Sequence, residues 1–208
     1  MLLIITALLS GRAFPAPAGP LGGKMVVVDP GHGGRDPGTV SEKVYEKDIN
    51  LQVALAIKKT LEGSGARVVL TREGDYSPDY SGGSVRRDLE KRLETARRHR
   101  AHIFLSIHTN SFRGIVDGGP EVFYNPGSVK GRLLAECIQK ELLSIPGVGR
   151  RSSRPSQCLV LGDNSIPSAL VELGFISSPD EKRKLLDRGY QSLLAEKIKA
   201  GVLRFYRL

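Results

Sequence analysis

Apolar and polar positions alternate in blocks along the chain, and these blocks predict strands and helices in turn. Short β-branched runs predict buried strands, and apolar residues three and four apart predict helices. Strands are expected at 25–29, 67–71, 103–108 and 121–124, and apolar runs at Cys158–Leu161 and Ala169–Leu173 bring the total to about six. Helices are expected at 46–63, 85–100, 133–142, 180–186 and 190–205. This order predicts a single α/β domain with a mostly parallel sheet and helices on both faces.

The first 24 residues differ from the rest of the chain. Residues 1–9 form an apolar run far shorter than the roughly 20 residues of a membrane-spanning helix, and a segment rich in Pro, Ala and Gly follows it. This pattern is typical of an export signal or a clipped membrane anchor, with a disordered leader as the alternative. We therefore expect a leader at 1–24, a folded domain at 25–208, and a protein that works outside the cytoplasm and associates with the membrane through its leader.

The composition is that of an ordinary globular protein with an excess of positive charge. The 208 residues include 31 Lys and Arg against 22 Asp and Glu, for a formal net charge of +9. This excess favours an acidic partner such as nucleic acid, anionic lipid or wall polymer. Nucleic acid is the least favoured of these, because only 6% of the residues are aromatic and acidic side chains interrupt the arginine-rich run 86–98.

The cysteines carry little functional information. There are two, Cys137 and Cys158, and this number excludes a disulfide-rich scaffold. Each falls in an apolar pattern, so buried free thiols are favoured over a disulfide between the two residues.

Polar residues stand where the predicted strands end. His32 follows the first strand, His108 ends the third, and Glu172 follows Val171 in the last apolar run. In open α/β sheets ligands bind beyond the carboxyl ends of the strands, so these side chains are expected to lie together. Taken alone, His32 is equally well a turn residue among glycines, and His108 is equally well a buried residue hydrogen-bonded to a carbonyl group. Two histidines at adjacent strand ends with a carboxylate nearby favour a metal site.

A catalytic zinc site commonly has two histidines and one glutamate as ligands, with one position left for water. Glu46, the first residue of the first predicted helix, can point back over the sheet end, and Glu42 competes with it as the third ligand. Glu172 lies between apolar residues, which raise the pKa of a carboxyl group and suit it to proton transfer. No H-E-x-x-H, Walker A or G-x-S-x-G motif occurs, so the chemistries that depend on them are excluded.

Six segments in this order resemble the zinc-dependent N-acetylmuramoyl-L-alanine amidases of the amidase type 3 family. They are VVVDPGHGGRDPG (26–38), EKDINL (46–51), VVLTR (68–72), FLSIHTNS (104–111), GGPEVFY (118–124) and ALVELGFISSPDE (169–181). The resemblance covers nearly all of the chain after Lys24. It implies a peptidoglycan hydrolase that cleaves the amide between N-acetylmuramic acid and the L-alanine of the stem peptide. It also implies one zinc ion on His32, Glu46 and His108, with Glu172 as the catalytic residue.

Within the family the chain is most similar to the compact spore-cortex amidases of germination. The arginine-rich helix at 86–100 and the lack of a wall-binding repeat in the sequence support this similarity. It implies removal of stem peptides during muramic-δ-lactam formation, at the forespore cortex. Two alternatives remain open: the same chemistry in vegetative autolysis or cell separation, and a non-catalytic protein that binds wall polymer or nucleic acid.

Two further residues are expected to contact the substrate because of their positions at strand ends. Arg72 can bind a carboxylate of the stem peptide through both arms of its guanidinium group, and a surface ion pair is the alternative. Asn110 can orient the site or hydrogen-bond the glycan.

Overall fold

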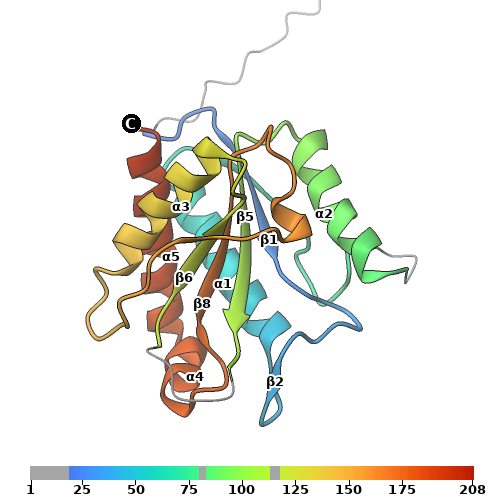
Figure 1. The fold of residues 1–208 in the computed structure, drawn as a ribbon, viewed down its shortest axis with the longest axis vertical. Helices are drawn as coiled ribbons and strands as arrows, with labels where there is room; N and C mark the ends of the chain where they lie inside the picture. The colour runs from blue at the N-terminus through green and yellow to red at the C-terminus, as the bar shows by residue number, and fades with distance from the viewer. Residues whose placement is uncertain (1–18, 80–82, 113–117) are drawn as a thin grey trace, which may run out of the picture.

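The computed structural model describes residues 19–79, 83–112 and 118–208 (Figure 1). All five expected helices are present in it, with ends that differ by a few residues. The helices are α1 (Glu46–Glu62), α2 (Val85–Arg98), α3 (Val129–Leu142), α4 (Pro179–Leu186) and α5 (Arg188–Phe205), and a 3-10 turn, η1, covers Leu159–Leu161. The strands are β1 (Met25–Pro30), β2 (Val40–Ser41), β3 (Val44–Tyr45), β4 (Arg67–Leu70), β5 (Ile103–Asn110), β6 (Glu121–Tyr124), β7 (Arg154–Pro155) and β8 (Ser168–Phe175).

One six-stranded sheet forms the centre of the molecule. Its strand order is β4-β1-β5-β8-β6-β7, and the first four of these strands are parallel to one another. Strand β6 runs antiparallel to β8, and the short β7 is parallel to β6. The expected single α/β domain with a mostly parallel sheet of about six strands is confirmed.

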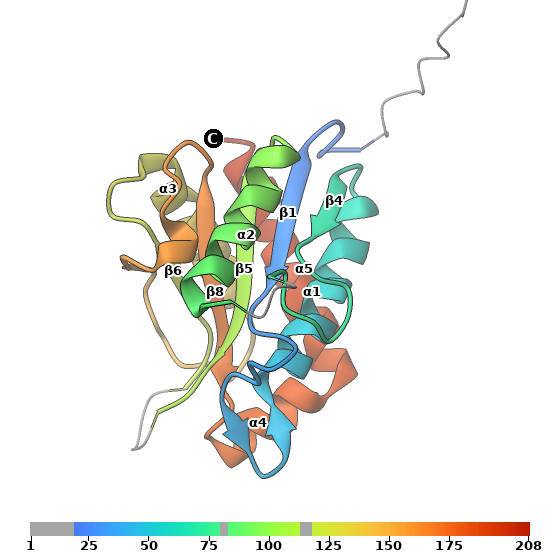
Figure 2. The ribbon, with the colours of Figure 1, turned by 90° about the vertical axis from the view of Figure 1, so that its right-hand side faces the viewer.

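Helices cover both faces of the sheet, as Figure 2 shows from the side. Alternate residues of a strand point to opposite faces. In β1, Val26 and Val28 pack into the larger core under α1, α3 and α5, whereas Val27 packs with Ala96 of α2 and Leu161 of η1 into a smaller core on the other face. Strands β1, β5 and β8 are therefore apolar on both sides, which explains why they appear in the sequence as continuous apolar runs.

One strand was expected in the wrong place. The apolar run at Cys158–Leu161 forms the turn η1, and the sixth strand of the sheet is instead Arg154–Pro155. The reason is that the consecutive residues Val160 and Leu161 are both buried against the same small core. A helical turn can direct two neighbouring side chains to one side, whereas a strand would direct them to opposite sides.

The two cysteines are free, as expected, but only one is buried. Cys137 lies in α3 with 5% of its surface exposed, whereas Cys158 is exposed and its Sγ lies 2.9 Å from Oγ of Ser156. The expected burial of Cys158 is wrong, because the run that begins there turns inward only at Val160.

The folded domain begins earlier than expected. Residues 1–18 of the expected leader lie outside the described residues, but Leu21 is fully buried in the larger core. Its backbone N–H donates to the carbonyl of Ser64 at 2.9 Å, and the N–H of Arg67 donates to the carbonyl of Lys24 at 2.8 Å. Residues 19–24 are therefore part of the domain, and the expected boundary at residue 25 is too late. Among the helices of the described residues, none combines the length and apolar character that a bilayer crossing requires.

We expect Leu21→Ala to lower the free energy of unfolding by about 2–5 kcal/mol, because it leaves a cavity in the core. Urea denaturation followed by circular dichroism measures this difference. Leu186→Ala at the end of α4, where the side chain is 49% exposed, is the matched control and should cost roughly 0.5 kcal/mol or less. Equal effects of the two substitutions would show that the segment before β1 is not part of the core.

Candidate functional site

The polar residues singled out in the sequence meet at one edge of the sheet. Strands β1, β5 and β8 are neighbours and parallel, so their carboxyl ends lie side by side, at the end of the molecule that also carries β2 and α4 (Figure 1). His32 follows β1, while His108 and Glu172 are paired in register on β5 and β8. His32, His108 and Glu172 therefore lie together at the carboxyl edge of the sheet, as expected.

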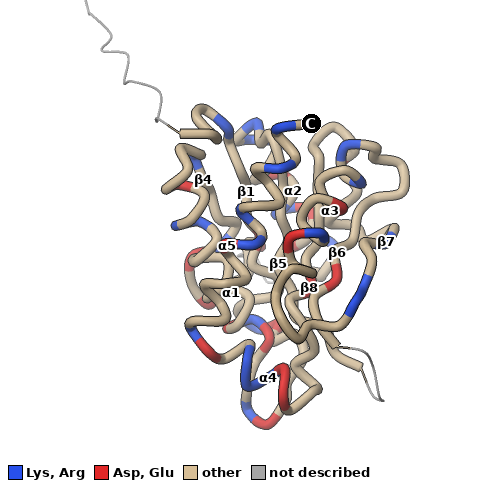
Figure 3. Tube along the Cα trace, turned by 90° about the vertical axis from the view of Figure 1, so that its left-hand side faces the viewer, with Lys and Arg blue, Asp and Glu red and all other residues tan. Residues whose placement is uncertain are grey.

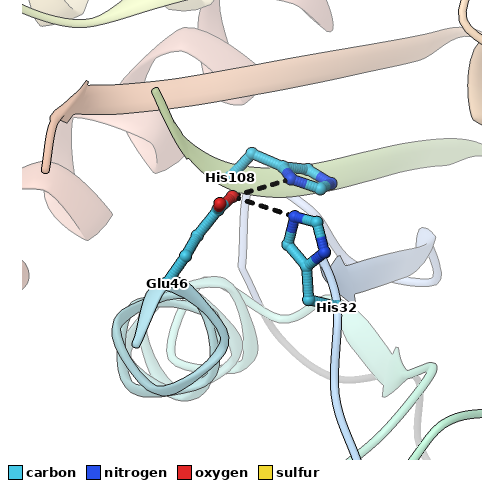
Figure 4. Close-up of side chains that lie close together, drawn as sticks. All are labelled: His32, Glu46 and His108. Atoms are coloured by element: carbon cyan, nitrogen blue, oxygen red, sulfur yellow. Dashed lines mark hydrogen bonds and ion pairs between the residues drawn. The ribbon is translucent and has the colours of Figure 1, made fainter. Parts of the chain in front are cut away.

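His32, Glu46 and His108 form a compact cluster (Figure 4). Oε1 of Glu46 lies 3.1 Å from Nε2 of His32 and 3.1 Å from Nδ1 of His108. The two rings are 4.9 Å apart at an angle of 79°. One ligand atom from each residue lies within 4.8 Å of the others, so the cluster could hold a metal ion. The imidazoles are 24% and 18% exposed, which leaves them open to a ligand from outside.

Two glycines make this close approach feasible. A Cβ atom at Gly31 would lie 2.2 Å from ring atoms of His108, and one at Gly38 would lie 2.7 Å from Oε2 of Glu46 and from Cδ2 of His32. A side chain at either position would therefore displace at least one member of the cluster. Glycine is required here for space, and at Gly38 also for a φ of +64°.

Hydrogen bonds from outside the cluster orient its members. Nδ1 of His32 lies 2.7 Å from Oδ2 of Asp36, which turns Nε2 toward Glu46. The carboxylate of Glu46 accepts the backbone N–H groups of Thr39 at 2.8 Å and Thr109 at 3.1 Å. Such outer contacts fix the rings and carboxylates that bind metals in proteins.

The charges in the cluster shift the pKa values of its members in opposite directions. Burial alone lowers the pKa of His32, but the carboxylates of Glu46 and Asp36 more than offset this and raise that pKa to about 9. Burial alone raises the pKa of Glu46, but hydrogen bonds and charge from His108 and His32 hold it far below its ordinary value. The cluster therefore carries a negative carboxylate at neutral pH, as a cation ligand must.

Glu172 occupies a different environment on the neighbouring strand. Burial raises the pKa of its carboxyl group to about 7, and the charge of Glu46 adds to this, against the opposing effect of His108. Its Oε2 atom is buried and has no hydrogen-bond partner among the described residues. A carboxyl group with these properties can take up and release a proton near neutral pH.

Glu46 and Glu42, the two candidates for the third ligand, lie in different places. Glu42 lies in the tight turn between β2 and β3, its side chain is 82% exposed, and Oε2 pairs with Nζ of Lys182 at 2.6 Å. Its φ of +51° is part of that turn. Only Glu46 lies in the cluster with the two histidines.

The structure contradicts the expected substrate contact of Arg72. The residue is 1% exposed, and its guanidinium group donates to the backbone carbonyls of Pro30, Gly31, Lys47 and Gly74 at 2.8–3.0 Å. A carboxylate of the substrate cannot reach donors that are buried and already bonded. The sequence position at a strand end was correct, but the side chain points into the protein.

Asn110 lies at the end of β5 and is half-buried. Its Oδ1 accepts the N–H of Ser111 at 2.7 Å, and its backbone carbonyl accepts the N–H of Ile176 at 2.9 Å. It shapes the exit from the strand, and its contact with substrate remains a prediction.

Beneath the site lies a buried polar network that the sequence pattern does not predict. Asp29, at the end of β1, is fully buried and accepts hydrogen bonds from Thr71 at 2.5 Å, Ser106 at 2.8 Å and Arg92 at 2.7 Å. Ser106 lies two residues before His108 on the same face of β5, so the network lies directly below the cluster. The only signal in the sequence was an arginine within the apolar stripe of α2.

Asn50 was also not singled out as a site residue. It is fully buried in α1, one turn after Glu46. Its Nδ2 donates to the carbonyl of Gly31 at 3.3 Å, and its Oδ1 accepts the hydroxyl of Thr109 at 2.8 Å. It therefore joins the three segments that carry the cluster. The motif EKDINL contains this residue, and its spacing of four from Glu46 is the signal that pointed to the same helix face.

The fold places the cluster at the carboxyl edge of a mostly parallel sheet, which is where open α/β proteins bind their ligands. The model of the family described as N-acetylmuramoyl-L-alanine amidase matches residues 26–204. The chain belongs to this family, and it is a peptidoglycan amidase that hydrolyses the bond between the muramoyl group and L-alanine.

Known proteins of similar sequence and structure agree with this assignment. The chain is 35% identical to the germination-specific N-acetylmuramoyl-L-alanine amidase of Bacillus subtilis (strain 168), over 90% of this chain and 81% of that protein. It is 32% identical to the amidase LytC of the same organism, of which it spans 36%. The CwlD amidase of Clostridioides difficile, solved in complex with the GerS lipoprotein, has a TM-score of 0.79 and 34% identity, over 88% of this chain and 98% of that one. AmiC2 of Nostoc punctiforme has a TM-score of 0.78 and 34% identity, over 89% and 98%.

The network below the site makes a prediction about stability. We expect Asp29→Asn to lower the free energy of unfolding at pH 7 by about 3 kcal/mol, because it removes a carboxylate that faces the buried guanidinium group of Arg92. Burial opposes ionisation of Asp29, but the charge of Arg92 and the hydrogen bonds from Thr71 and Ser106 hold its pKa below the usual 3.8. The contribution is therefore fully present above about pH 4 and is lost as the pH falls through the lower folded-state pKa.

Urea denaturation of both proteins at pH 7, 5 and 3 measures this dependence. The difference between them should be constant from pH 7 to 5 and smaller at pH 3. Asp48→Asn, at an exposed position in α1, is the control and should cost roughly 0.5 kcal/mol. A difference for Asp29→Asn that grows on acidification contradicts the assignment.

Proposed function

We propose that this amidase is zinc-dependent, that His32, Glu46 and His108 hold one zinc ion, and that Glu172 is the catalytic base. The observation that carries the proposal is the position of a single oxygen of Glu46, 3.1 Å from a nitrogen of each histidine. The register pairing of Glu172 with His108 adds a protonatable carboxyl group beside that cluster.

The chemistry of the cluster fits zinc in particular. Two imidazoles and one carboxylate form a common ligand set of catalytic zinc sites, which leaves one position for a substrate or solvent molecule. Hard cations such as calcium and magnesium prefer oxygen ligands in larger number. The glycines at 31 and 38 let the rings and the carboxylate approach one another closely, as the ligands of one ion must.

In the proposed reaction, Glu172 moves the proton. When bound, zinc supplies Lewis acidity at the scissile carbonyl group. Glu172 takes a proton from the attacking water as the new C–O bond forms, and it delivers this proton to the nitrogen of L-alanine as the C–N bond breaks. The products are the free lactyl carboxylate of the muramic acid and a stem peptide with a new amino terminus. A pKa of about 7 suits both transfers.

We propose the spore cortex as the substrate, with muramic-δ-lactam formation as the outcome, and an exported protein as the setting. Support comes from the similarity to the Bacillus subtilis amidase that is described as germination-specific. The same chemistry in vegetative autolysis or cell separation is the alternative, because other similar amidases are not described as germination-specific. The cell-wall amidases among the relatives support action outside the cytoplasm.

The positive charge of the chain is compatible with a wall polymer and does not require nucleic acid. Along α2, Arg86 pairs with Glu90 at 2.9 Å and Lys91 pairs with Glu94 at 2.6 Å. On the side of the molecule drawn in Figure 3, basic and acidic segments are interspersed along α1 and α4. Such a mixed surface favours a solvated face over a phosphate-binding stripe.

We expect Glu172→Gln to retain zinc and to lose about 10²–10⁴-fold in the rate of hydrolysis, because glutamine cannot accept a proton. Digestion of purified cortex and vegetative peptidoglycan, followed by mass analysis and assay of new amino-terminal alanine, measures the rate. A chelator should abolish the activity of the wild type. Glu90→Gln, exposed in α2, is the control. Near-normal release of peptides by Glu172→Gln contradicts its role, and faster digestion of vegetative wall contradicts the cortex assignment.

We expect Glu46→Gln to weaken zinc binding by at least about 100-fold, since even groups that merely orient metal ligands contribute 10–100-fold. Competition with a chromogenic chelator measures the dissociation constant. Glu42→Gln is the matched control from the adjacent hairpin and should bind zinc as the wild type does. The reverse order of effects would assign the third ligand to the hairpin.

A further inference from the structure

The turn that carries His32 has a backbone conformation that must be held by its surroundings. His32 has a φ of +63°, and Gly33 and Gly34 follow with φ values of +129° and +60°. The left-handed region is unfavourable for any residue with a side chain. It persists at functional sites where neighbouring groups fix it. The position of the His32 imidazole therefore depends on contacts of the turn's backbone.

Two buried arginines make those contacts through three consecutive carbonyl groups. The carbonyl of Pro30 accepts from Nε of Arg72 at 2.9 Å and from Nη1 of Arg92 at 2.8 Å. The carbonyl of Gly31 accepts from Nη2 of Arg72 at 3.0 Å, and that of His32 accepts from Nη2 of Arg92 at 2.9 Å. Both arginines are 1% exposed, so these contacts are shielded from water.

Arg72 also connects this turn to the helix that carries Glu46. The same Nη2 atom that donates to Gly31 donates to the carbonyl of Lys47 at 2.8 Å. Gly31 directly precedes His32, and Lys47 directly follows Glu46. One nitrogen thus bridges the backbones next to two members of the cluster and sets the distance between them.

Arg92 is itself held by two carboxylates. Nη1 lies 2.7 Å from Oδ1 of Asp29, and Nε lies 2.7 Å from Oδ2 of Asp88. Asp29 ends β1 and Asp88 lies one turn earlier in α2, so the guanidinium plane is fixed by the sheet and by the helix. A planar group with fixed orientation presents its remaining donors in one geometry, which a flexible ammonium group does not.

We propose that Arg72 and Arg92 are positioning residues that hold the His32 turn in the conformation in which its imidazole faces Glu46 and His108. This inference rests on the proposed zinc site. Both arginines are 1% exposed and lie outside the cluster of His32, Glu46 and His108. They act through the backbone of residues 30–32, and they organise the cluster before an ion arrives.

The test uses arginine-to-lysine substitutions, which keep the positive charge and remove the planar guanidinium group with its several donors. We expect Arg72→Lys and Arg92→Lys each to weaken zinc binding by about 10–100-fold in chelator competition. With Co²⁺ in place of zinc, the visible absorption bands should shift, because the ligand geometry changes. Arginine variants that bind zinc and Co²⁺ as the wild type does would overturn the proposal.

A control separates positioning from general stability. Leu194→Ala removes a fully buried side chain of α5 on the other side of the sheet from Arg92, and it should lower the unfolding temperature without changing zinc affinity or the Co²⁺ spectrum. Equal weakening of zinc binding by Leu194→Ala would overturn the proposal.

If the arginine variants do not fold, Asp88→Asn serves in their place, because it releases Nε of Arg92 without removing a contact to the turn. It should weaken zinc binding severalfold, and an unchanged affinity would overturn the proposal.

A measurement on metal-free protein tests the role of the arginines independently of the proposed zinc site. If the wild type binds neither zinc nor Co²⁺, the zinc proposal fails, and nitrogen-15 NMR of the histidine rings decides the role of the arginines. The ring signals of His32, assigned with His32→Asn, should shift in both arginine variants and not in Leu194→Ala. Unchanged His32 signals in the arginine variants would overturn the positioning role.

Discussion

The carboxylate of Asp29 is fully buried at the end of a central strand, and a buried charge is stable only where opposite charge and hydrogen-bond donors surround it. This constraint draws Arg92 into the protein from α2, together with the hydroxyl groups of Thr71 and Ser106. The guanidinium group that balances the charge has donors left over, and these bind the turn that carries His32. The polar layer under the sheet edge thus joins the core of the protein to its reactive groups.

Two carboxyl groups near each other at this edge have opposite acid–base properties. Glu46 lies between two imidazoles and accepts backbone N–H groups, so its pKa lies far below the ordinary range and it stays charged. Glu172 lies in an apolar strand with one oxygen that has no hydrogen-bond partner among the described residues, and its pKa rises to about 7. Environments that separate the pKa values of neighbouring carboxyl groups are typical of sites where one group stays ionised and the other transfers a proton.

The strands and helices follow from the apolar pattern because burial on both sheet faces requires continuous β-branched runs. The strand-end rule likewise brought His32, His108 and Glu172 together, since parallel neighbours end at one edge. Periodicity could not distinguish a strand from a 3-10 turn at Cys158–Leu161, where two adjacent side chains are buried. The predicted substrate contact of Arg72 was wrong because a place at a strand end does not reveal the direction of the side chain, which here is buried. Arg92 was missed because its partner, Asp29, is 63 residues away and an arginine in a basic helix resembles a surface residue.

Strand β8 lies between β5 and β6, although it follows both of them along the chain. Its partner on β5 is far away in sequence: Ser168 pairs with Phe104. Contacts between such distant segments form late in folding, because closing long loops costs entropy before the contact is made. During synthesis the turn that carries His32 and strand β5 emerge well before β8, the strand that bears Glu172. A polypeptide that stops before β8 therefore lacks Glu172, which reaches its place beside His108 only when this strand inserts into the middle of the sheet.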